Sequence, residues 1–457
     1  MEEGTMTAIE ERVGSLSTVV SGAVLMPQDS GYDEARQCHN GLIDKRPALI
    51  VRCRNAADVA AAIAFAREAG LEVSIRGGGH NVGGRAVTEG GVMIDLAEMK
   101  QIEVDPETRT ARAEGGVTWA ELNEANAEHG LAVTGGLVST TGIAGYTLGG
   151  GLGWLMGSYG LAADNLVSVE LVTATGDILN VTSESHPDLF WALRGGGGNF
   201  GVATSFEYRL HPVREVTAGL VAHPIDAAPE VLRFYREFTK TEPDELGALG
   251  ALVHAPDGSG AKLAAIAVCH AGSPDQAERD LAPVKEFGSP VLVDIGRMPY
   301  PASNTLLDDA YPKGALNYWK SSFVRDLDDT LLDDIVERFA STPSSMTAIA
   351  LEHFHGAVTR VGVTDTAVPH RDESYNLLIT SVWMDPATTE ENLAWTQESF
   401  DAFSTHFVDR RWLNYLVDDD GTDAVRAAYG PNYDRLVEVK RRYDPENVFH
   451  LNHNIPA

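Results

Sequence analysis

The sequence has few cysteines, and none at the spacing of a metal or redox motif. Cys38, Cys53 and Cys269 are the only cysteines among 457 residues, and no CxxC pair occurs. An odd number of widely spaced thiols argues against both a disulfide framework and a cysteine-rich zinc cluster. We expect all three to be buried as small apolar side chains.

Long apolar runs and a basic N-terminal segment are also missing. No apolar run approaches the roughly 18 residues that would span a bilayer. The first residues include Glu2, Glu3, Glu10 and Glu11, where a secretory signal has basic residues followed by an apolar core. We therefore expect a cytoplasmic protein that has no membrane partner.

Basic residues are scarce relative to acidic ones. The chain has 35 Lys and Arg against 66 Asp and Glu, which gives a formal net charge of −31 at pH 7. This charge argues against nucleic acid as a partner, because such binding depends on neutralising phosphates with Lys and Arg. The acidic residues are spread along the chain, and we interpret the resulting acidic surface as halophilic, because high salt would screen its self-repulsion.

Glycine, in contrast, is concentrated in three segments. They are residues 76–84 (RGGGHNVGG), 145–153 (GYTLGGGLG) and 194–201 (RGGGGNFG). Glycine-rich loops expose backbone N–H groups that bind anions, and they let a ligand approach the backbone closely. Three such clusters predict one elongated ligand, and a pyrophosphate fits this description.

The first cluster follows a strand, a helix and a second strand. Residues 48–53 and 71–75 have the composition of strands, and residues 56–70 have apolar side chains at helical spacing and a closing glycine. The cluster therefore lies at the carboxyl end of a strand, where ligand sites of α/β units collect.

The third cluster contains a GxGxxG match that raises the alternative of a Rossmann nucleotide fold. That fingerprint requires a strand before the glycines and a helix after them. Here residues 187–193 predict a helix and residues 202–208 alternate as a strand does. The order is reversed, so we interpret the match as accidental.

The middle of the chain has a different composition and residue pattern. From about residue 212 to about residue 408, glycine is rarer, and helical and alternating segments mix. Residues 345–360 and 375–383 predict strands. Residues 433–442 predict a helix that ends before Pro445.

Four motifs, in order, resemble the berberine-bridge-enzyme-like FAD-linked oxidases of the vanillyl-alcohol oxidase superfamily, in particular the bacterial members. They are residues 76–84, 142–165 (GIAGYTLGGGLGWLMGSYGLAADN), 194–201 and 443–456 (YDPENVFHLNHNIP). The resemblance implies an α+β fold with a PCMH-type FAD-binding domain and a substrate domain whose antiparallel sheet is covered by helices. We predict that residues 1–210 begin the FAD domain, 211–409 form the substrate domain, and 410–457 return to the FAD domain.

The resemblance implies a covalent flavin. His80 occupies the position of the histidine that bonds to the flavin 8α-methyl carbon in the family. Many relatives add a second link through a cysteine whose place is held here by Val138, so we expect a single link. The other residues that the resemblance assigns to FAD are Arg76, Gly77, Gly78, Gly79, Asn81, Gly84, Thr141, Gly142, Gly145, Tyr146, Gly149, Gly150, Gly151, Gly153, Asn165, Gly198, Asn199, Gly201, Val202, Asn452 and Asn454.

The expected reaction is oxidation of an alcohol, sugar or secondary metabolite by hydride transfer to flavin N5, with molecular oxygen as acceptor. Relatives place a basic tyrosine in a Tyr-x-Asn-aromatic motif, which reads Trp-Leu-Asn-Tyr at residues 412–415. Tyr415 remains a candidate base, with Trp412 and Tyr415 placed on opposite faces of a strand. Glu352 and His353 are further candidates, and we expect no metal.

Two alternatives remain open from the sequence. One is a dehydrogenase that passes electrons to a quinone or a redox protein. Thr141 holds the position that faces the oxygen-reactive edge of the flavin in the family; its small side chain resembles oxygen-using members, but threonine is not the usual residue there. The other is a flavin-binding protein that has lost catalysis together with the first tyrosine of its motif.

Overall fold

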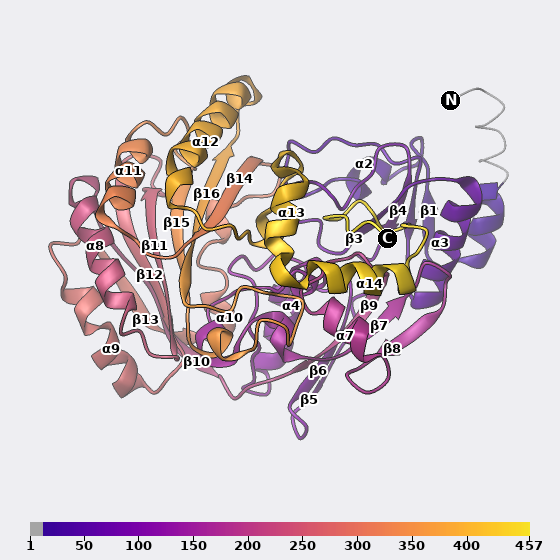
Figure 1. Ribbon diagram of the computed structural model, residues 1–457, viewed down its shortest axis with the longest axis horizontal. Helices are drawn as coiled ribbons and strands as arrows, with labels where there is room; N and C mark the ends of the chain where they lie inside the picture. Colours follow the sequence, from indigo (N-terminus) through magenta and orange to yellow (C-terminus); the bar gives the residue numbers. More distant parts are fainter. Residues whose placement is uncertain (1–11) are drawn as a thin grey trace.

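Three β-sheets organise the chain. The computed structural model describes residues 12–457. Figure 1 shows the largest sheet with its helices in one half of the molecule, and the N-terminal strands together with the last helices in the other half. The result is an α+β fold, as expected.

The first sheet has four strands in the order β1-β2-β4-β3, of which β2, β4 and β3 are parallel. The strands are β1 (Ala23–Leu25), β2 (Leu49–Arg52), β3 (Val73–Arg76) and β4 (Val92–Asp95). Helix α3 (Ala56–Ala69) connects β2 to β3; Asn55 caps its start, and Gly70 ends it at a φ of 65°. The predicted strand, helix and strand are confirmed.

The second sheet has five antiparallel strands in the order β5-β6-β9-β7-β8. They are β5 (Ile102–Asp105), β6 (Thr110–Glu114), β7 (Leu166–Val172), β8 (Ile178–Val181) and β9 (Val202–Arg209). Helix α7 (Pro187–Leu193) precedes the third glycine cluster and β9 follows it. The rejection of a Rossmann fingerprint is therefore confirmed.

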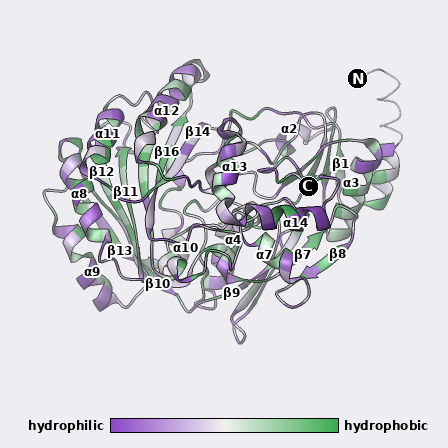
Figure 2. Cartoon of the chain, viewed as in Figure 1, coloured by the Kyte–Doolittle hydropathy of each residue, from purple (hydrophilic) through white to green (hydrophobic). Residues whose placement is uncertain are grey.

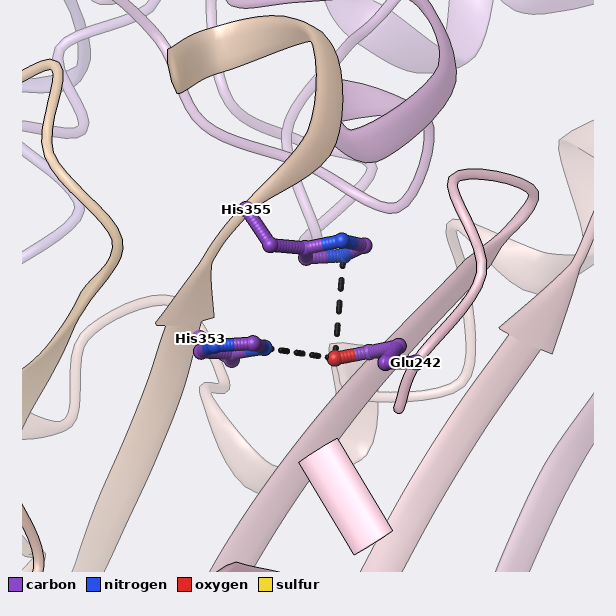
Figure 3. Close-up of side chains that lie close together, drawn as sticks. All are labelled: Glu242, His353 and His355. Carbon is purple, nitrogen blue, oxygen red and sulfur yellow. Dashed lines mark hydrogen bonds and ion pairs between the residues drawn. The ribbon is translucent and has the colours of Figure 1, made fainter. Parts of the chain in front are cut away.

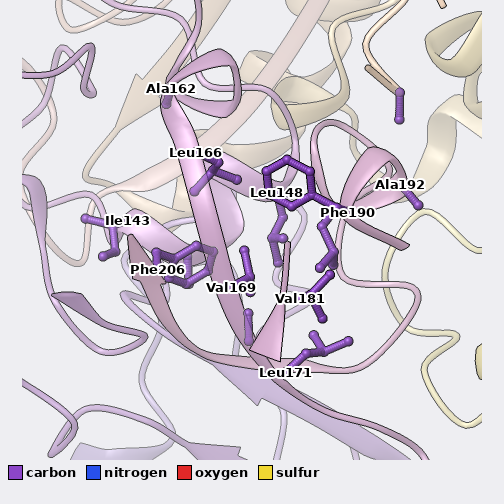
Figure 4. Packing of buried hydrophobic residues seen from close by; sticks show 14 of the residues in the cluster. Ile143, Leu148, Ala162, Leu166, Val169, Leu171, Val181, Phe190, Ala192 and Phe206 are labelled. Atoms are coloured by element: carbon purple, nitrogen blue, oxygen red, sulfur yellow. The ribbon is translucent and has the colours of Figure 1, made fainter. Parts of the chain in front are cut away.

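A hydrophobic cluster joins this sheet to the C-terminal segment. Figure 4 shows Leu148, Val169, Phe190 and Phe206 packed together, and the same cluster continues into Leu436 of helix α14 (Tyr433–Tyr443). Burial of these apolar side chains is the main force that brings the two ends of the chain into one half of the molecule. The exact domain boundaries at residues 210 and 410 stay predictions.

The third sheet is antiparallel, with seven strands in the order β13-β10-β12-β11-β15-β16-β14. The strands are β10 (Glu215–Pro224), β11 (Leu246–His254), β12 (Lys262–His270), β13 (Leu292–Pro299), β14 (Leu316–Val324), β15 (Ala348–Phe354) and β16 (Ser374–Trp383). One face carries the helices α8 (Ala228–Thr239), α9 (Pro274–Glu286), α11 (Asp329–Ala340) and α12 (Thr389–Phe403). Figure 2 shows that these helices have polar outer surfaces and that the strands beneath them are apolar. The opposite face is thus left to form the wall of a site.

Shorter elements connect the sheets. The remaining α-helices are α2 (Tyr32–Ala35), α4 (Trp119–Ala127), α5 (Ile143–Leu148), α6 (Met156–Tyr159), α10 (Tyr300–Ser303) and α13 (Gly421–Tyr429). The 3-10 helices are η1 (Ala162–Asn165), η2 (Ile225–Ala227), η3 (Asp308–Ala310), η4 (Gly356–Arg360), η5 (Pro386–Thr388), η6 (Ser404–His406), η7 (Leu413–Tyr415), η8 (Asp418–Asp420) and η9 (Gly430–Asn432).

Two local predictions are wrong. The strand expected over residues 345–360 ends at Phe354, because Gly356 takes a left-handed φ of 62° and starts the 3-10 helix η4. Tyr415 does not lie on a strand, because its backbone N–H donates to the Trp412 carbonyl at 3.1 Å and closes a 3-10 turn.

The structure bears on the expectations about membrane-spanning segments and about the cysteines. Within residues 12–457, no helix is both long enough and apolar enough to cross a membrane. The three cysteines are buried and unpaired, as expected.

The substitution Gly78→Ala should destabilise the fold. A Cβ at Gly78 would lie 2.4 Å from the backbone nitrogen of Gly142, and neither backbone can move freely. We expect a loss of about 1–3 kcal/mol in the free energy of unfolding, as for overpacked interiors, measured by urea denaturation. Gly296→Ala is the matched control, because its Cβ would meet nothing within 4 Å. Equal stability of the two variants would contradict the close approach of the two backbones.

Candidate functional site

A cavity lies where the three glycine clusters meet. Strand β3, helix α5 and the segment before β9 each supply part of its wall, and Trp319 of β14 contributes from the large sheet. The predicted cofactor residues that line it are Gly77, Gly78, Gly79, His80, Asn81, Val138, Thr141, Gly142, Gly145, Tyr146, Gly149, Gly198, Gly201, Val202 and Asn452. Segments more than 350 residues apart in the chain, such as those of His80 and Asn452, therefore share one surface.

The glycines at this wall have two different surroundings. At Gly198 a Cβ would lie 2.7 Å from Asn452 Nδ2, which donates to the Gly198 carbonyl at 2.8 Å. At Gly145 a Cβ would meet nothing within 4 Å of protein and would project into open space. The first glycine lets two segments pack, and the second leaves room beside helix α5.

His80 presents a neutral imidazole to the cavity. Its ring stacks on His39 with centroids 3.8 Å apart, and its Nε2 lies 3.3 Å from Thr140 Oγ1. Burial, with a smaller contribution from His39, lowers the pKa of His80 from 6.5 to about 3. The ring is therefore neutral at physiological pH, which leaves one nitrogen lone pair free to act as a nucleophile.

Some predicted cofactor residues do not line the cavity. Asn165 donates from Nδ2 to the carbonyls of Tyr159 and Leu161, and Asn199 donates to those of Gly196 and His453. These amides hold the loops around the cavity. The other predicted cofactor residues that do not line the cavity are Arg76, Gly84, Gly150, Gly151, Gly153 and Asn454.

Two of the three candidate catalytic residues lie together. Tyr415 of η7 lines the cavity, and its hydroxyl donates to Glu352 Oε1 at 2.9 Å. Asn376 Nδ2 donates to the other carboxylate oxygen, Glu352 Oε2, at 2.6 Å. Burial raises the pKa of Glu352 from 4.5 to about 7, against the two hydrogen bonds that lower it. Burial also raises the pKa of Tyr415. The pair therefore offers a carboxyl group that titrates near neutral pH.

His353 lies on the other face of β15. Its Nδ1 is 2.6 Å from Glu242 Oε2, and its ring stacks on Tyr375. Because successive strand residues point to opposite faces, the structure brings Glu352 and Tyr415 together and leaves His353 apart from them.

Several lining residues were missed in the sequence. Asn414 belongs to the motif at residues 412–415 and could have been found there; it donates to the Tyr146 carbonyl at 3.2 Å. Arg85 follows the first glycine cluster directly and donates to the carbonyls of Leu451 and Asn452. No local sequence feature identifies Trp319 as a lining residue, because only the strand order of the large sheet brings it to the cavity.

Comparisons with known proteins agree with this geometry. Residues 47–182 match the family model of an FAD binding domain, and residues 412–456 match the model described as berberine and berberine like. The (R)-6-hydroxynicotine oxidase of Paenarthrobacter nicotinovorans is 33% identical over 95% of this chain and 97% of that protein. The chain belongs to the berberine-bridge-enzyme-like family of FAD-linked oxidoreductases.

Other relatives extend the comparison. An FAD-linked oxidoreductase of Dictyostelium discoideum is 32% identical over 90% of this chain and 88% of that protein. The crystal structure of 6-hydroxy-D-nicotine oxidase from Arthrobacter nicotinovorans superposes with a TM-score of 0.87 at 31% identity, covering 95% and 98% of the two chains. A berberine bridge enzyme variant, at 24% identity and a TM-score of 0.88, has the same fold. The chain is therefore an enzyme of FAD-dependent oxidation.

The polar groups at the cavity fit an FAD molecule. Asn81 Oδ1, the Tyr146 hydroxyl and His453 Nδ1 are buried there, and none has a hydrogen-bond partner within residues 12–457. Buried polar atoms require partners, and the carbonyls, nitrogens and hydroxyls of a flavin dinucleotide supply both donors and acceptors. Its pyrophosphate suits the exposed N–H groups of the glycine loops.

Replacing Glu352 should change the pH dependence of stability. A carboxyl whose pKa is raised on folding stabilises the fold below pH 4.5 and loses this contribution as pH rises through about 7. Glu352→Gln keeps the shape and cannot ionise, so we expect it to become more stable than wild type between pH 5 and 8, by about 3 kcal/mol at most. Urea denaturation across this range measures the difference, with exposed Glu103→Gln as control. A constant offset at all pH values would contradict the buried, neutral carboxyl.

Proposed function

We propose that this chain is an oxidase that holds FAD through one covalent bond from His80 and oxidises an alcohol, sugar or secondary metabolite, with molecular oxygen as acceptor. One observation carries the proposal: a neutral His80 and Tyr415, whose hydroxyl donates to Glu352, line the same cavity. The first supports attachment of the cofactor and the second supports removal of a proton.

The attachment needs a neutral nucleophile in a fixed orientation. The stacked His39 ring and the Thr140 hydroxyl restrict the rotation of the His80 ring, and burial keeps that ring uncharged. Val138 lines the cavity and has no thiol, which supports a single covalent link. The bound FAD supplies a hydride acceptor.

The proton of the substrate O–H or N–H group goes to the Tyr415–Glu352 pair. A substrate hydroxyl that donates to Tyr415 can pass its proton through the phenol oxygen to the Glu352 carboxylate. Asn376 holds the second carboxylate oxygen and so fixes the orientation of the first. A carboxyl with a pKa of about 7 can accept a proton during the reaction and release it afterwards.

The glycine and asparagine positions divide into two roles under this proposal. Those that line the cavity contact the cofactor. Asn165 and Asn199, whose amides hydrogen-bond to backbone carbonyls, shape the loops that contact it. The small side chain of Thr141 lines the cavity and is compatible with access of oxygen.

His80→Ala should abolish the covalent bond to the flavin. After denaturation in acid or detergent and filtration, the wild-type polypeptide should retain the yellow flavin, whereas the variant should release the flavin into the filtrate. His211→Ala is the matched control, because His211 is a partly buried histidine that hydrogen-bonds Asn165 away from the cavity. Release of the flavin from wild-type protein would contradict the covalent link without affecting the assignment of the family.

Anaerobic stopped-flow mixing tests the reaction itself. We expect at least one member of a panel of alcohols, sugars, phenols and hydroxylated N-heterocycles to bleach the flavin, and air to restore its colour rapidly. Glu352→Gln should slow bleaching by about 10²–10⁴-fold, as for loss of a general base, while Glu103→Gln should not. Slow recolouring in air would identify a dehydrogenase instead, and equal bleaching rates would remove Glu352 from the mechanism.

A further inference from the structure

Three ionisable side chains meet on the face of β15 that is turned away from the flavin cavity. Glu242 lies between α8 and β11, and His353 and His355 lie at the end of β15. Figure 3 shows both rings beside the Glu242 carboxylate. Glu242 Oε2 is 2.6 Å from His353 Nδ1 and 3.7 Å from His355 Nε2.

The cluster is buried and incompletely satisfied. The side chains of Glu242, His353 and His355 are 0%, 1% and 7% exposed. Glu242 Oε1 and His353 Nε2 have no hydrogen-bond partner within the part of the chain that the structure describes. A carboxyl group in such a place needs a compensating positive charge if it is to ionise.

Burial favours the uncharged form of every member of the cluster. It raises the pKa of Glu242, lowers the pKa of His353 to about 3, and lowers the pKa of His355. Neutral imidazoles are the metal-binding form of histidine, so both rings are ready to act as ligands at physiological pH. A bound cation would also allow the carboxylate to form.

The geometry allows one ion between the three groups. One ligand atom from each lies within 4.8 Å of the others. A tetrahedral zinc ion with bonds of ~2.0–2.1 Å places its ligands roughly 3.3 Å apart. The Glu242 oxygen must therefore move away from His353 by less than about 1 Å. The His355 ring lies nearly parallel to the His353 ring, at an interplanar angle of 7°, and must turn so that its Nε2 points at the ion.

We propose that Glu242, His353 and His355 bind a divalent transition metal ion of the zinc type, through Oε2, Nδ1 and Nε2 respectively. Two imidazoles and one carboxylate form a ligand set that suits zinc, with water as a fourth ligand. Glu373 Oε1 lies 3.6 Å from His353 Nε2, the second ring nitrogen, where an outer carboxylate orients a metal-bound histidine.

This site was not expected from the sequence. Glu352, the glutamate adjacent to His353 in the sequence, points to the opposite face of β15. Glu242 is more than 100 residues away in the chain and is brought to the histidines by the pairing of β11 with β15.

The ion would act as a structural brace. It joins the turn after α8 to the end of β15, directly before the chain turns at Gly356. A Cβ at Gly157 of α6 would lie 2.6 Å from the His355 ring, so α6 packs closely against the same point. Glu352 is the neighbour of His353 in sequence, and a fixed His353 helps to fix its position.

Metal titration of the flavin-loaded protein tests the proposal. After dialysis against a chelator, ZnCl2 should bind with a stoichiometry of one ion per chain in calorimetry and raise the melting temperature. CoCl2 should give the intense visible bands of tetrahedral Co²⁺ at wavelengths longer than those that flavin absorbs. Glu242→Gln and His355→Gln should each weaken Zn²⁺ binding by at least about tenfold.

His270→Gln is the matched control. His270 is a buried histidine whose Nε2 lies 3.0 Å from Asp280 Oδ2, and within residues 12–457 it belongs to no group of three potential metal ligands. Its loss should leave Zn²⁺ binding unchanged. Unchanged binding in Glu242→Gln and His355→Gln would overturn the proposal and leave a hydrogen-bonded cluster. If a variant does not fold, the Co²⁺ spectrum of the wild-type protein decides between the outcomes. A spectrum that shows only the hydrated ion would overturn the proposal.

Discussion

The close approach of two backbones at Gly78 and Gly142 is the contact on which the site depends. A Cβ on either residue would lie 2.4 Å from the backbone nitrogen of the other. This approach sets the loop after β3 directly against the start of α5. His80 from the first segment and Thr141, Gly145 and Tyr146 from the second can then share one cavity wall. Large side chains at the crossing would separate the walls and open the cavity.

Burial shifts the pKa values of His80 and Glu352 in opposite directions, and in both cases it favours the uncharged form. It lowers the pKa of His80 and raises the pKa of Glu352, because a low-dielectric environment disfavours either charge. Under the proposed function, the neutral histidine serves as the nucleophile, and the carboxyl serves as a base near neutral pH. A single physical effect thus supports both cofactor attachment and proton transfer under the proposed function.

Strand β15 separates two sites of different chemistry. Glu352 and Phe354 face the cavity side, where Phe354 packs against Trp412. His353 and His355 face Glu242 beneath the helices of the large sheet. Alternation along one strand therefore couples the proposed catalytic base to the proposed metal site through adjacent residues, so that a change on one face can shift the other.

Much of the fold follows from local sequence. Asn55 and Gly70 delimit helix α3, the apolar alternation of residues 202–208 predicts β9, and the glycine motifs identify the family and most of the cavity lining. These features are local, because caps, turns and periodicity act over a few residues. Tertiary structure alone decided that Tyr415 sits in a 3-10 turn against Glu352, that Trp319 reaches the cavity, and that Glu242 meets two histidines. Each of these contacts joins segments many residues apart, so strand order, register and burial determine them and no short stretch of sequence contains them.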